Sequence, residues 1–435
     1  MPHNWRPRNY QLPAWQYMEG PEEGKRAALV WHRRAGKDLW AINLCGVKAH
    51  ERTGTYWHVL PTYKQGRKIV WDGFTRDGRK FRSYFPPELV MSENASDMKI
   101  TLRCGSIYQV VGTDDVDSLV GTNPIGVVFS EYSLHDPAAW DYIRPILAEN
   151  GGWAVFIYTM RGKNHGYKML QMAQKNPTWF AQVLVAGNAG TRREDGSPVI
   201  SDSIIEEERA AGMSEELIQQ EFYCSAEAPL VGAYYGKQMM DADKEGRLCR
   251  VPWEPNLLVH TAWDLGIGDS TAIWFFQQFG MEVRVINFYE NSGEGLAHYV
   301  KKLGEMGYAY GQHLAPHDIE VRELTTGVTR RNAARGLGIN FRVVGKHLVE
   351  DGIEQTRTLL PKCWFDTVKC DRGLEALKSY RKEYDEKRKT FRDNPEHDWA
   401  SHGADAFRIL AMGIRPMRRE NRQKTAVDEH DYLHA

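Results

Sequence analysis

The sequence predicts an α/β protein of two domains, the first built on a mostly parallel sheet and the second on a mixed sheet. Its length of 435 residues corresponds to roughly two to three domains of about 150 residues each. In the first half, short apolar runs alternate with helical patterns, which is typical of a parallel α/β sheet. In the second half, strand-like runs follow one another directly, which is typical of an antiparallel meander.

The first domain is expected to alternate buried strands with connecting helices. Its apolar runs of strand length are Ala27–Trp31, Thr55–Leu60, Ile107–Gly112, Ile125–Ser130 and Trp153–Tyr158. Helical patterns are expected at Asp38–Ala49 and, in a strongly charged form, at Ser203–Glu221. We place this domain at residues 1–225.

A change of pattern separates the two domains. Proline and glycine residues accumulate between residues 226 and 255, so we expect a linker there. The second domain, residues 256–414, opens with consecutive strands expected at Leu257–Leu265, Ser270–Gln277 and Glu282–Tyr289. Its remaining expected elements are a helix Glu294–Gly304, a strand leading into Asp318, a strand Asn340–Val344 and a helix Ala400–Met412. The polar tail, residues 415–435, is expected to be poorly ordered.

Composition excludes several classes of protein. With 42% hydrophobic and 26% charged residues, the chain is neither a disordered protein nor a disulfide scaffold. The net charge of −1 neither supports nor excludes a DNA partner, because basic groups can line a single channel. The six cysteines include no C-x-x-C pair, which argues against a zinc module and for a reducing compartment. The N-terminus lacks a signal peptide's apolar core and no apolar run is as long as a membrane span, so we expect a soluble, cytosolic protein.

A candidate phosphate-binding loop follows the first strand. His32-Arg33-Arg34-Ala35-Gly36-Lys37 precedes a helix, and this is the architecture of a P-loop, whose backbone N–H groups and helix N-terminus hold phosphates. Lys37 would reach the β- and γ-phosphates. The pattern departs from the standard one twice, because Trp31 replaces the first glycine and Asp38 replaces Ser or Thr. From these residues alone, an ordinary loop before a helix is the alternative.

A second feature favours the phosphate-binding interpretation. The apolar run that ends at Ser130 is followed by Glu131, which suits a general base for an attacking water. The position where nucleotide hydrolases carry the metal-linked Asp is Ser130. Because a Mg²⁺ site of this kind needs one hydroxyl and one carboxylate, we hypothesise that Asp38 and Ser130 supply this pair in exchanged positions.

Further residues of the first domain are candidates with ordinary alternatives. Arg33 and Arg34 would stabilise charge on the γ-phosphate, as an arginine finger in cis does, or be solvated loop charges. Tyr10 and Gln11 would contact adenine, or belong to an N-terminal segment packed on the core. Thr159 follows a central strand, where a γ-phosphate sensor is expected.

The second domain carries a set of acidic residues on separate elements. Asp264 lies within an apolar strand, Asp318 ends a later strand, and Asp405 lies in the last helix. A buried carboxylate is costly unless it is paired or binds a cation, and carboxylates from several elements are what a two-metal phosphodiester site needs. Oxygen ligands favour Mg²⁺ or Mn²⁺.

The other candidates for this acidic set are Glu290, Asp398 and His402, of which Asp398 and His402 share a helical face with Asp405. The ordinary alternatives are a helix cap for Asp398, a turn for Asp269, a loop acid for Asp318 and a surface residue for His402.

The motifs taken together resemble those of the large terminase subunits of tailed double-stranded DNA bacteriophages. The resemblance extends from about Arg6 to Met412. It is carried by His32–Lys37, Pro61–Gln65, Gly112–Gly121 leading to Val128–Glu131, Trp263–Gly266 and Ser401–Arg408.

The resemblance implies an N-terminal ASCE-type P-loop ATPase followed by an RNase H-like nuclease. By position, Lys37 with Ala35 and Gly36 would bind the phosphates of ATP, Glu131 would polarise water, and Thr159 would couple hydrolysis to DNA movement. Asp264, Asp318 and Asp405 would hold Mg²⁺, for which Mn²⁺ can substitute.

The implied partners are double-stranded DNA, a portal protein and a small terminase subunit. The chain would form a homo-oligomeric ring on the procapsid in the host cytoplasm and be monomeric on its own. Candidate DNA contacts, or alternatively a solvated basic face, are Arg330, Arg331, Arg335, Lys346 and His347. The tail's candidate contacts, or alternatively an inert segment, are Arg415, Arg418, Arg419, Arg422 and Lys424.

Two further functions compete with a packaging motor that also cuts DNA. One is an RNase H-like nuclease whose N-terminal domain binds nucleotide only as a regulator. The other is a DNA-binding scaffold in which both sites have decayed, and the retention of Lys37, Glu131 and the three aspartates argues against it. DNA-stimulated ATP turnover separates the motor from the regulated nuclease.

Overall fold

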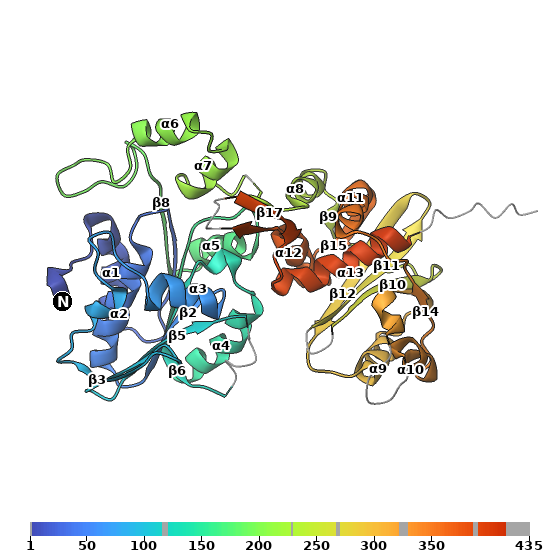
Figure 1. The fold of residues 1–435 in the computed structure, drawn as a ribbon, viewed down its shortest axis with the longest axis horizontal. Coiled ribbons are helices and arrows are strands. Elements are labelled where there is room, and N and C mark those ends of the chain that lie inside the picture. Colours follow the sequence, from blue (N-terminus) through green and yellow to red (C-terminus); the bar gives the residue numbers. More distant parts are fainter. Residues whose placement is uncertain are drawn as a thin grey trace, which may run out of the picture. The chain divides into compact units, whose positions relative to one another are not determined.

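A computed structural model describes residues 2–114, 121–227, 229–266, 270–321, 329–385 and 390–414 (Figure 1). Three predictions therefore fall on residues outside the described ranges. They concern residues 115–120 of the motif Gly112–Gly121, the turn at Asp269, and the tail from Arg415. The contacts divide the chain into two units, Met1–Met240 with Arg372–Ala404, and Asp241–Asp371 with the chain from Asp405 onward. The domain boundaries predicted from the sequence stay a prediction. No helix of the described part is both long and apolar enough to cross a membrane.

The first unit is built on a mostly parallel sheet. Its strands are β1 (Arg26–Trp31), β2 (Thr55–Leu60), β3 (Val90–Asn94), β4 (Lys99–Leu102), β5 (Ile107–Gly112), β6 (Pro124–Ser130), β7 (Trp153–Tyr158) and β8 (Trp179–Leu184). They lie in the order β3-β4-β5-β2-β6-β7-β1-β8. In this order, every pair of neighbouring strands from β5 through β2, β6, β7 and β1 to β8 is parallel. The pairs β3–β4 and β4–β5 are antiparallel. Because β7 lies between β1 and β6, the carboxyl ends of these three strands meet at one edge.

Helices and a hairpin complete the first unit. The helices are α1 (Leu12–Glu19), α2 (Lys37–Glu51), α3 (Tyr63–Gly66), α4 (Ala138–Glu149), α5 (His165–Lys175), α6 (Asp202–Ala210), α7 (Glu215–Glu221) and α12 (Asp371–Ser379), and α8 (Gly236–Lys244) crosses the boundary between the units. The hairpin strands are β16 (Lys382–Asp385) and β17 (Thr390–Pro395). Strand β1 is buried on both faces, with Leu29 and Trp31 in one apolar cluster and Ala28 and Val30 in another. This burial explains its continuous apolar sequence.

The charged stretch Ser203–Glu221 is two helices rather than the single one expected. Helix α6 ends before Gly212, whose φ of +97° is a left-handed conformation that ends a helix. Ser214 then caps α7, because its side chain accepts a hydrogen bond from the Leu217 amide. The break directs Glu221 into the interior, where its side chain is only 3% exposed.

The second unit is built on a mixed sheet, and the predicted α/β class with two sheets is thereby confirmed. Its strands are β9 (Leu248–Cys249), β10 (Val259–Leu265), β11 (Thr271–Phe279), β12 (Glu282–Asn291), β13 (Tyr310–Ala315), β14 (Phe341–Val343) and β15 (Cys363–Asp366), in the order β14-β13-β10-β11-β12-β15-β9. Strands β10, β11 and β12 form the expected antiparallel meander. Strands β13 and β14 extend it in parallel beyond β10.

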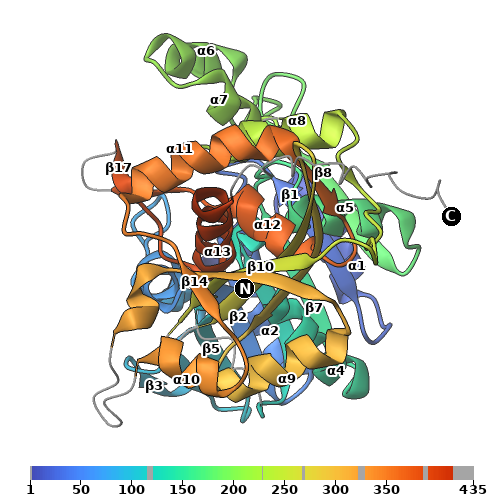
Figure 2. The same ribbon diagram turned by 90° about the vertical axis from the view of Figure 1, so that its right-hand side faces the viewer.

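The two faces of the second sheet pack against different helices (Figure 2). These helices are α9 (Leu296–Met306), α10 (Arg330–Gly336), α11 (Val349–Leu359) and the part of α13 (Trp399–Gly413) from Asp405 onward, since α13 also crosses the boundary between the units. Trp263 and Phe275 point to the face covered by α9 and α10, in one apolar cluster with Leu303. Trp274, the neighbour of Phe275, points to the opposite face and packs edge-on against Phe407 of α13, with ring centroids 5.2 Å apart. Since side chains alternate along a strand, Asp264 lies on the α13 face.

A buried histidine makes the stability of the second unit depend on pH. Burial lowers the pKa of His313 to about 4, and its Nδ1 lies 2.7 Å from the hydroxyl of Thr261. Below about pH 6.5 this histidine is protonated in the unfolded chain. In the folded chain it stays neutral down to about pH 4. The free energy of unfolding therefore falls over this range, by at most about 1.4 kcal/mol per pH unit for one such group.

We expect His313→Gln to reduce this pH dependence. The measurement is urea unfolding of the full chain at pH 7.0 and pH 5.5, with the exposed His50→Gln as the control variant. An unchanged difference between the two pH values would show that His313 is protonated in the folded protein.

Candidate active sites

The loop between β1 and α2 is held in a P-loop-like shape by specific contacts. Gly36 has a φ of +85° and Arg34 a φ of +70°, both left-handed. Gln11 is buried, and its Nε2 donates to the Ala35 carbonyl over 2.8 Å. A Cβ on Gly36 would lie 3.2 Å from this Nε2, so the contact also requires a glycine. Gln11 therefore shapes the loop, and a contact to adenine stays a prediction.

The tryptophan that replaces the first glycine of the P-loop pattern has a structural reason. The Trp31 indole is fully buried and packs edge-on against Trp40 of α2, with ring centroids 5.7 Å apart. Its Nε1 donates to Oε1 of Gln182 over 3.1 Å. The ring therefore fastens the first turns of α2 to the sheet and points into the core, leaving the loop itself to residues 32–36.

Lys37 lies where the three central strands end. Its Nζ donates to the Trp31 carbonyl over 3.0 Å and to Oγ1 of Thr159 over 2.9 Å. It also lies 3.8 Å from a carboxylate oxygen of Glu131. The loop lysine, the residue after β7 and the acid after β6 thus meet in one place, as their strand order requires.

Asp38 and Ser130 are in direct contact. The Ser130 hydroxyl donates to Asp38 Oδ1 over 2.5 Å, and Nε2 of the buried His58 lies 3.4 Å from the same oxygen. Burial raises the pKa of Asp38, but the contacts with His58 and Ser130 and the charge of Lys37 outweigh it, and the net effect lowers this pKa. Asp38 is therefore an anion next to a hydroxyl, which is the oxygen pair that a Mg²⁺ ion with bound phosphates takes.

We expect exchanging these two residues to preserve part of the site. Asp38→Ser and Ser130→Asp should each lower ATP turnover by about 10- to 100-fold, because each removes one member of the pair. The double variant should recover at least about tenfold over either single variant, and recovery stays incomplete because His58 then faces a hydroxyl. Steady-state phosphate release measures this, and losses that simply add would exclude exchanged roles.

Glu131 adopts a conformation that a catalytic position explains. It is one of the non-glycine residues with a left-handed backbone, at a φ of +58°, a strain that functional sites commonly retain. Its Oε2 is buried and makes no hydrogen bond within the described residues. A buried carboxylate oxygen without a donor costs free energy, so this atom fits a site that is completed by a water molecule or by metal-bound water.

The two loop arginines differ in their surroundings. Both side chains are exposed, but Nη1 of Arg33 lies 3.6 Å from Oε2 of Glu221, and the Arg33 amide donates to the Glu221 carbonyl over 2.8 Å. Arg161 Nη1 approaches the other oxygen of Glu221 at 2.6 Å. His58, Glu221 and Arg161 are the residues that sequence reasoning missed. Only His58 left a signal, as a polar residue within the apolar run Thr55–Leu60.

In the second unit, strand register places two acids in one row. Asp264 pairs with Ala272 across β10 and β11, and Glu290 pairs with Ala272 across β11 and β12. Directly opposed residues point to the same face, so both acids lie on the face that α13 covers, separated by the small Ala272. Asp318 lies in the short 3-10 helix His317–Glu320, just beyond the end of β13, and is exposed. Because β13 runs parallel to β10, Asp318 and Asp264 lie towards the same edge of the sheet.

After Trp399, helix α13 presents one partly exposed stripe and is otherwise buried. The stripe consists of His402, Asp405, Arg408 and Met412. Asp405 forms an ion pair with Arg408 over 3.1 Å. Asp398 precedes the helix and caps it, because its carboxylate accepts from the Ala400 amide over 2.9 Å.

The carboxylates are suited to Mg²⁺ or Mn²⁺ by chemistry. Within the described ranges no three acidic, histidine or cysteine side chains lie close enough together to hold one ion. The roles of Asp264, Asp318 and Asp405 as metal ligands therefore stay a prediction.

Basic residues lie near these acids. Arg330 Nη1 donates to the carbonyl of Leu265, the residue that follows Asp264, over 3.2 Å. Arg331 forms an ion pair with Glu320 over 2.6 Å, and Arg335 and Lys346 are exposed. Arg330 is thus placed beside the end of the strand that carries Asp264.

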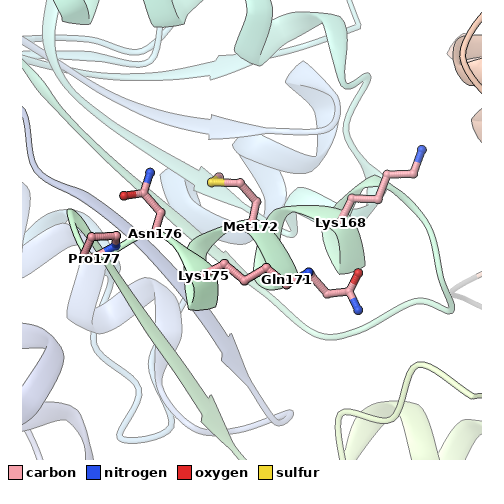
Figure 3. Close-up of a pocket in the computed structure, with 6 residues that line it drawn as sticks. All are labelled: Lys168, Gln171, Met172, Lys175, Asn176 and Pro177. Carbon is pink, nitrogen blue, oxygen red and sulfur yellow. The ribbon is translucent and has the colours of Figure 1, made fainter.

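A surface hollow of about 600 Å³ lies elsewhere in the first unit, along one side of α5 (Figure 3). Its described lining comprises Lys168, Gln171, Met172, Lys175, Asn176 and Pro177. None of the predicted site residues lines it, and the Lys168 amine is 2.8 Å from the buried Glu375. We assign it no role in either candidate site.

Comparisons with known proteins agree with the resemblance found in the motifs. No family model matches the chain. The chain is 24% identical to the large terminase subunit of Escherichia phage T5 over 423 residues, which cover 94% of this chain and 91% of that protein. The resemblance to large terminase subunits is thereby confirmed.

Three solved structures are also similar to the chain. One is the large terminase of a thermophilic bacteriophage in complex with ADP, with a TM-score of 0.41, 16% identity and coverage of 93% of this chain and 98% of that one. The ATPase domain of the Thermus phage P74-26 large terminase has a TM-score of 0.39, 18% identity and coverage of 51% and 94%. The cobalt-bound nuclease of the phage G20c large terminase has a TM-score of 0.31, 12% identity and coverage of 42% and 98%.

Proposed function

We propose that this chain is the ATP-hydrolysing, DNA-translocating and DNA-cutting subunit of a viral genome-packaging motor. The observation that carries the proposal is the meeting of Lys37, Thr159 and Glu131 at the carboxyl ends of β1, β7 and β6. Ligands of open α/β sheets bind at such an edge. Similarity to a large terminase subunit over 94% of the chain supports the same proposal.

The ATPase half would work through the residues gathered at this edge. Lys37, with the backbone of Ala35 and Gly36, binds the phosphates, and Glu131 orients and deprotonates the attacking water. Asp38 and Ser130 offer the oxygens for Mg²⁺, which would neutralise phosphate charge when bound. Thr159 contacts Lys37 directly, so a change at the phosphates reaches β7, and we assign it the coupling of hydrolysis to DNA movement.

The nuclease half would cut double-stranded DNA with the acids on the α13 face and at the end of β13. Asp264, Asp318 and Asp405 are proposed to hold Mg²⁺ or Mn²⁺, which would activate water and stabilise the leaving 3′-oxygen. Arg330, Arg331, Arg335, Lys346 and His347 would hold the phosphate backbone, so binding should be sensitive to salt and tolerant of sequence.

The proposal includes partners and a place of action. The chain would assemble as a ring on the portal protein of a procapsid in the host cytoplasm, with a small terminase subunit selecting the genome. Isolated chains would be monomers, because the portal supplies the ring's platform.

DNA-stimulated ATP turnover tests the proposal against a nuclease that binds nucleotide only as a regulator. We expect the purified chain to hydrolyse ATP faster when double-stranded DNA is added, and Lys37→Ala to lose at least about 100-fold in turnover. Lys163→Ala, which removes a partly exposed amine close in sequence to Thr159, is the matched control. Nucleotide binding without turnover, with or without DNA, would favour the regulated nuclease.

A further inference from the structure

Glu221 joins two arginines beside the phosphate-binding loop. Each carboxylate oxygen of Glu221 forms an ion pair with one arginine. Oε1 lies 2.6 Å from Nη1 of Arg161, and Oε2 lies 3.6 Å from Nη1 of Arg33. Burial raises the pKa of Glu221, but the charges of Arg161 and Arg33 outweigh it and hold this pKa below its usual range. Glu221 is therefore a buried anion that fixes the distance between the loop arginine and Arg161.

Arg161 follows the sensor position by two residues. Thr159, directly after β7, contacts the Lys37 amine. Arg161 therefore follows closely in the chain after a residue at the phosphate-binding lysine, and its side chain contacts Glu221. Its Nη1 also lies 3.5 Å from Oε1 of Gln220, while its Nε is buried and makes no hydrogen bond within the described residues. The guanidinium thus retains a buried donor beside a site that is built for an anion.

Arg161 is better prepared than Arg33 to act on a phosphate. Its side chain is 15% exposed and that of Arg33 is 62% exposed. A less exposed charge is screened less by water and loses less side-chain entropy when it binds. The positive charges of Lys37, Arg33 and Arg161 are matched in number by the negative charges of Glu131, Glu221 and Asp38 in the free protein.

We propose that Arg161 is a further phosphate-binding residue that contacts the γ-phosphate of ATP, and that Glu221 is the residue that positions it. This inference rests on the proposed ATPase function and assigns to Arg161 the role that the sequence suggested for Arg33. The γ-phosphate takes over donors of Arg161 that Glu221 and Gln220 hold in the free protein. Glu221 remains as the carboxylate that keeps both arginines at the mouth of the loop.

Separate affinities for a non-hydrolysable ATP analogue and for ADP test this inference, because only the analogue carries a γ-phosphate. Arg161→Lys keeps the charge but loses the planar fork, so affinity for the analogue should fall about tenfold and affinity for ADP should stay within about twofold. Arg161→Ala should lower kcat for ATP hydrolysis by at least about 100-fold. Glu221→Gln should weaken analogue binding in the same selective way, by less than Arg161→Lys does.

The controls are Lys163→Ala and Glu227→Gln, which break an ion pair of 3.4 Å close to Arg161 and Glu221 in sequence. Both should leave the two affinities unchanged. Equal losses for analogue and ADP in Arg161→Lys, or no loss for either, would overturn the inference while leaving the proposed ATPase intact. A wild-type chain that binds neither nucleotide would instead contradict the proposed function itself.

Discussion

Replacing Glu131 by glutamine is expected to lower kcat for ATP hydrolysis by about 1,000-fold, within the range for losing a general base. Glutamine has nearly the same size, so the left-handed backbone and the position next to Lys37 are retained. It cannot accept the proton of the attacking water. Since Glu131 stands where the water is expected rather than where the phosphates bind, affinity for ATP should change little.

Phosphate release and equilibrium nucleotide binding measure the two effects separately. Glu149→Gln, at the exposed end of α4, is the control for the loss of a carboxylate. Equal losses in binding and turnover would place Glu131 among the nucleotide ligands instead, and an unchanged kcat would mean that the base lies elsewhere.

Replacing Asp264 by asparagine is expected to reduce metal-dependent nicking of supercoiled DNA by about 100-fold or more, the scale for removing an essential member of a metal site. Asp264 is an acid within an apolar strand, and its neighbours Trp263 and Leu265 are buried. ATP turnover should not change, since the substitution lies in the second unit.

Plasmid nicking with Mg²⁺, with Mn²⁺ and with EDTA measures this effect. Asp351→Asn, on the exposed surface of α11, serves as the control. Cleavage that survives in EDTA, or that Asp264→Asn leaves intact, would contradict a carboxylate–metal nuclease. The ATPase half would then carry the function alone.

The sequence is sufficient to predict elements whose burial is continuous or alternating. Strand β1 is apolar throughout because both of its faces are covered, and the run that ends at Ser130 has the same pattern and the same cause. The contact between Asp38 and Ser130 can also be anticipated, because parallel strands bring their carboxyl ends to one edge of the sheet.

Other features depend on partners that the sequence does not link. In the sequence, Glu221 is one of many acids in a charged helical stretch, and the pattern does not distinguish it from the others. It becomes a partner of Arg161 because the helix breaks at Gly212 and α7 is buried. Strand β9 is too short to leave a pattern and exists because β15 offers it an edge. The capping role of Asp398 follows from its position alone, since an acid before a helix is more often a cap than a ligand.

The single exposed stripe of α13 has a consequence for how this segment can change over evolution. Each residue inserted into a helix turns everything beyond it by about 100°, so one extra residue between Asp405 and Phe407 would separate the acid from the aromatic anchor beside Trp274. With buried side chains on nearly every other side, no rotation of the helix restores both positions. Substitutions of His402 or Met412 would leave this geometry intact, whereas any change of length within the helix would disrupt it.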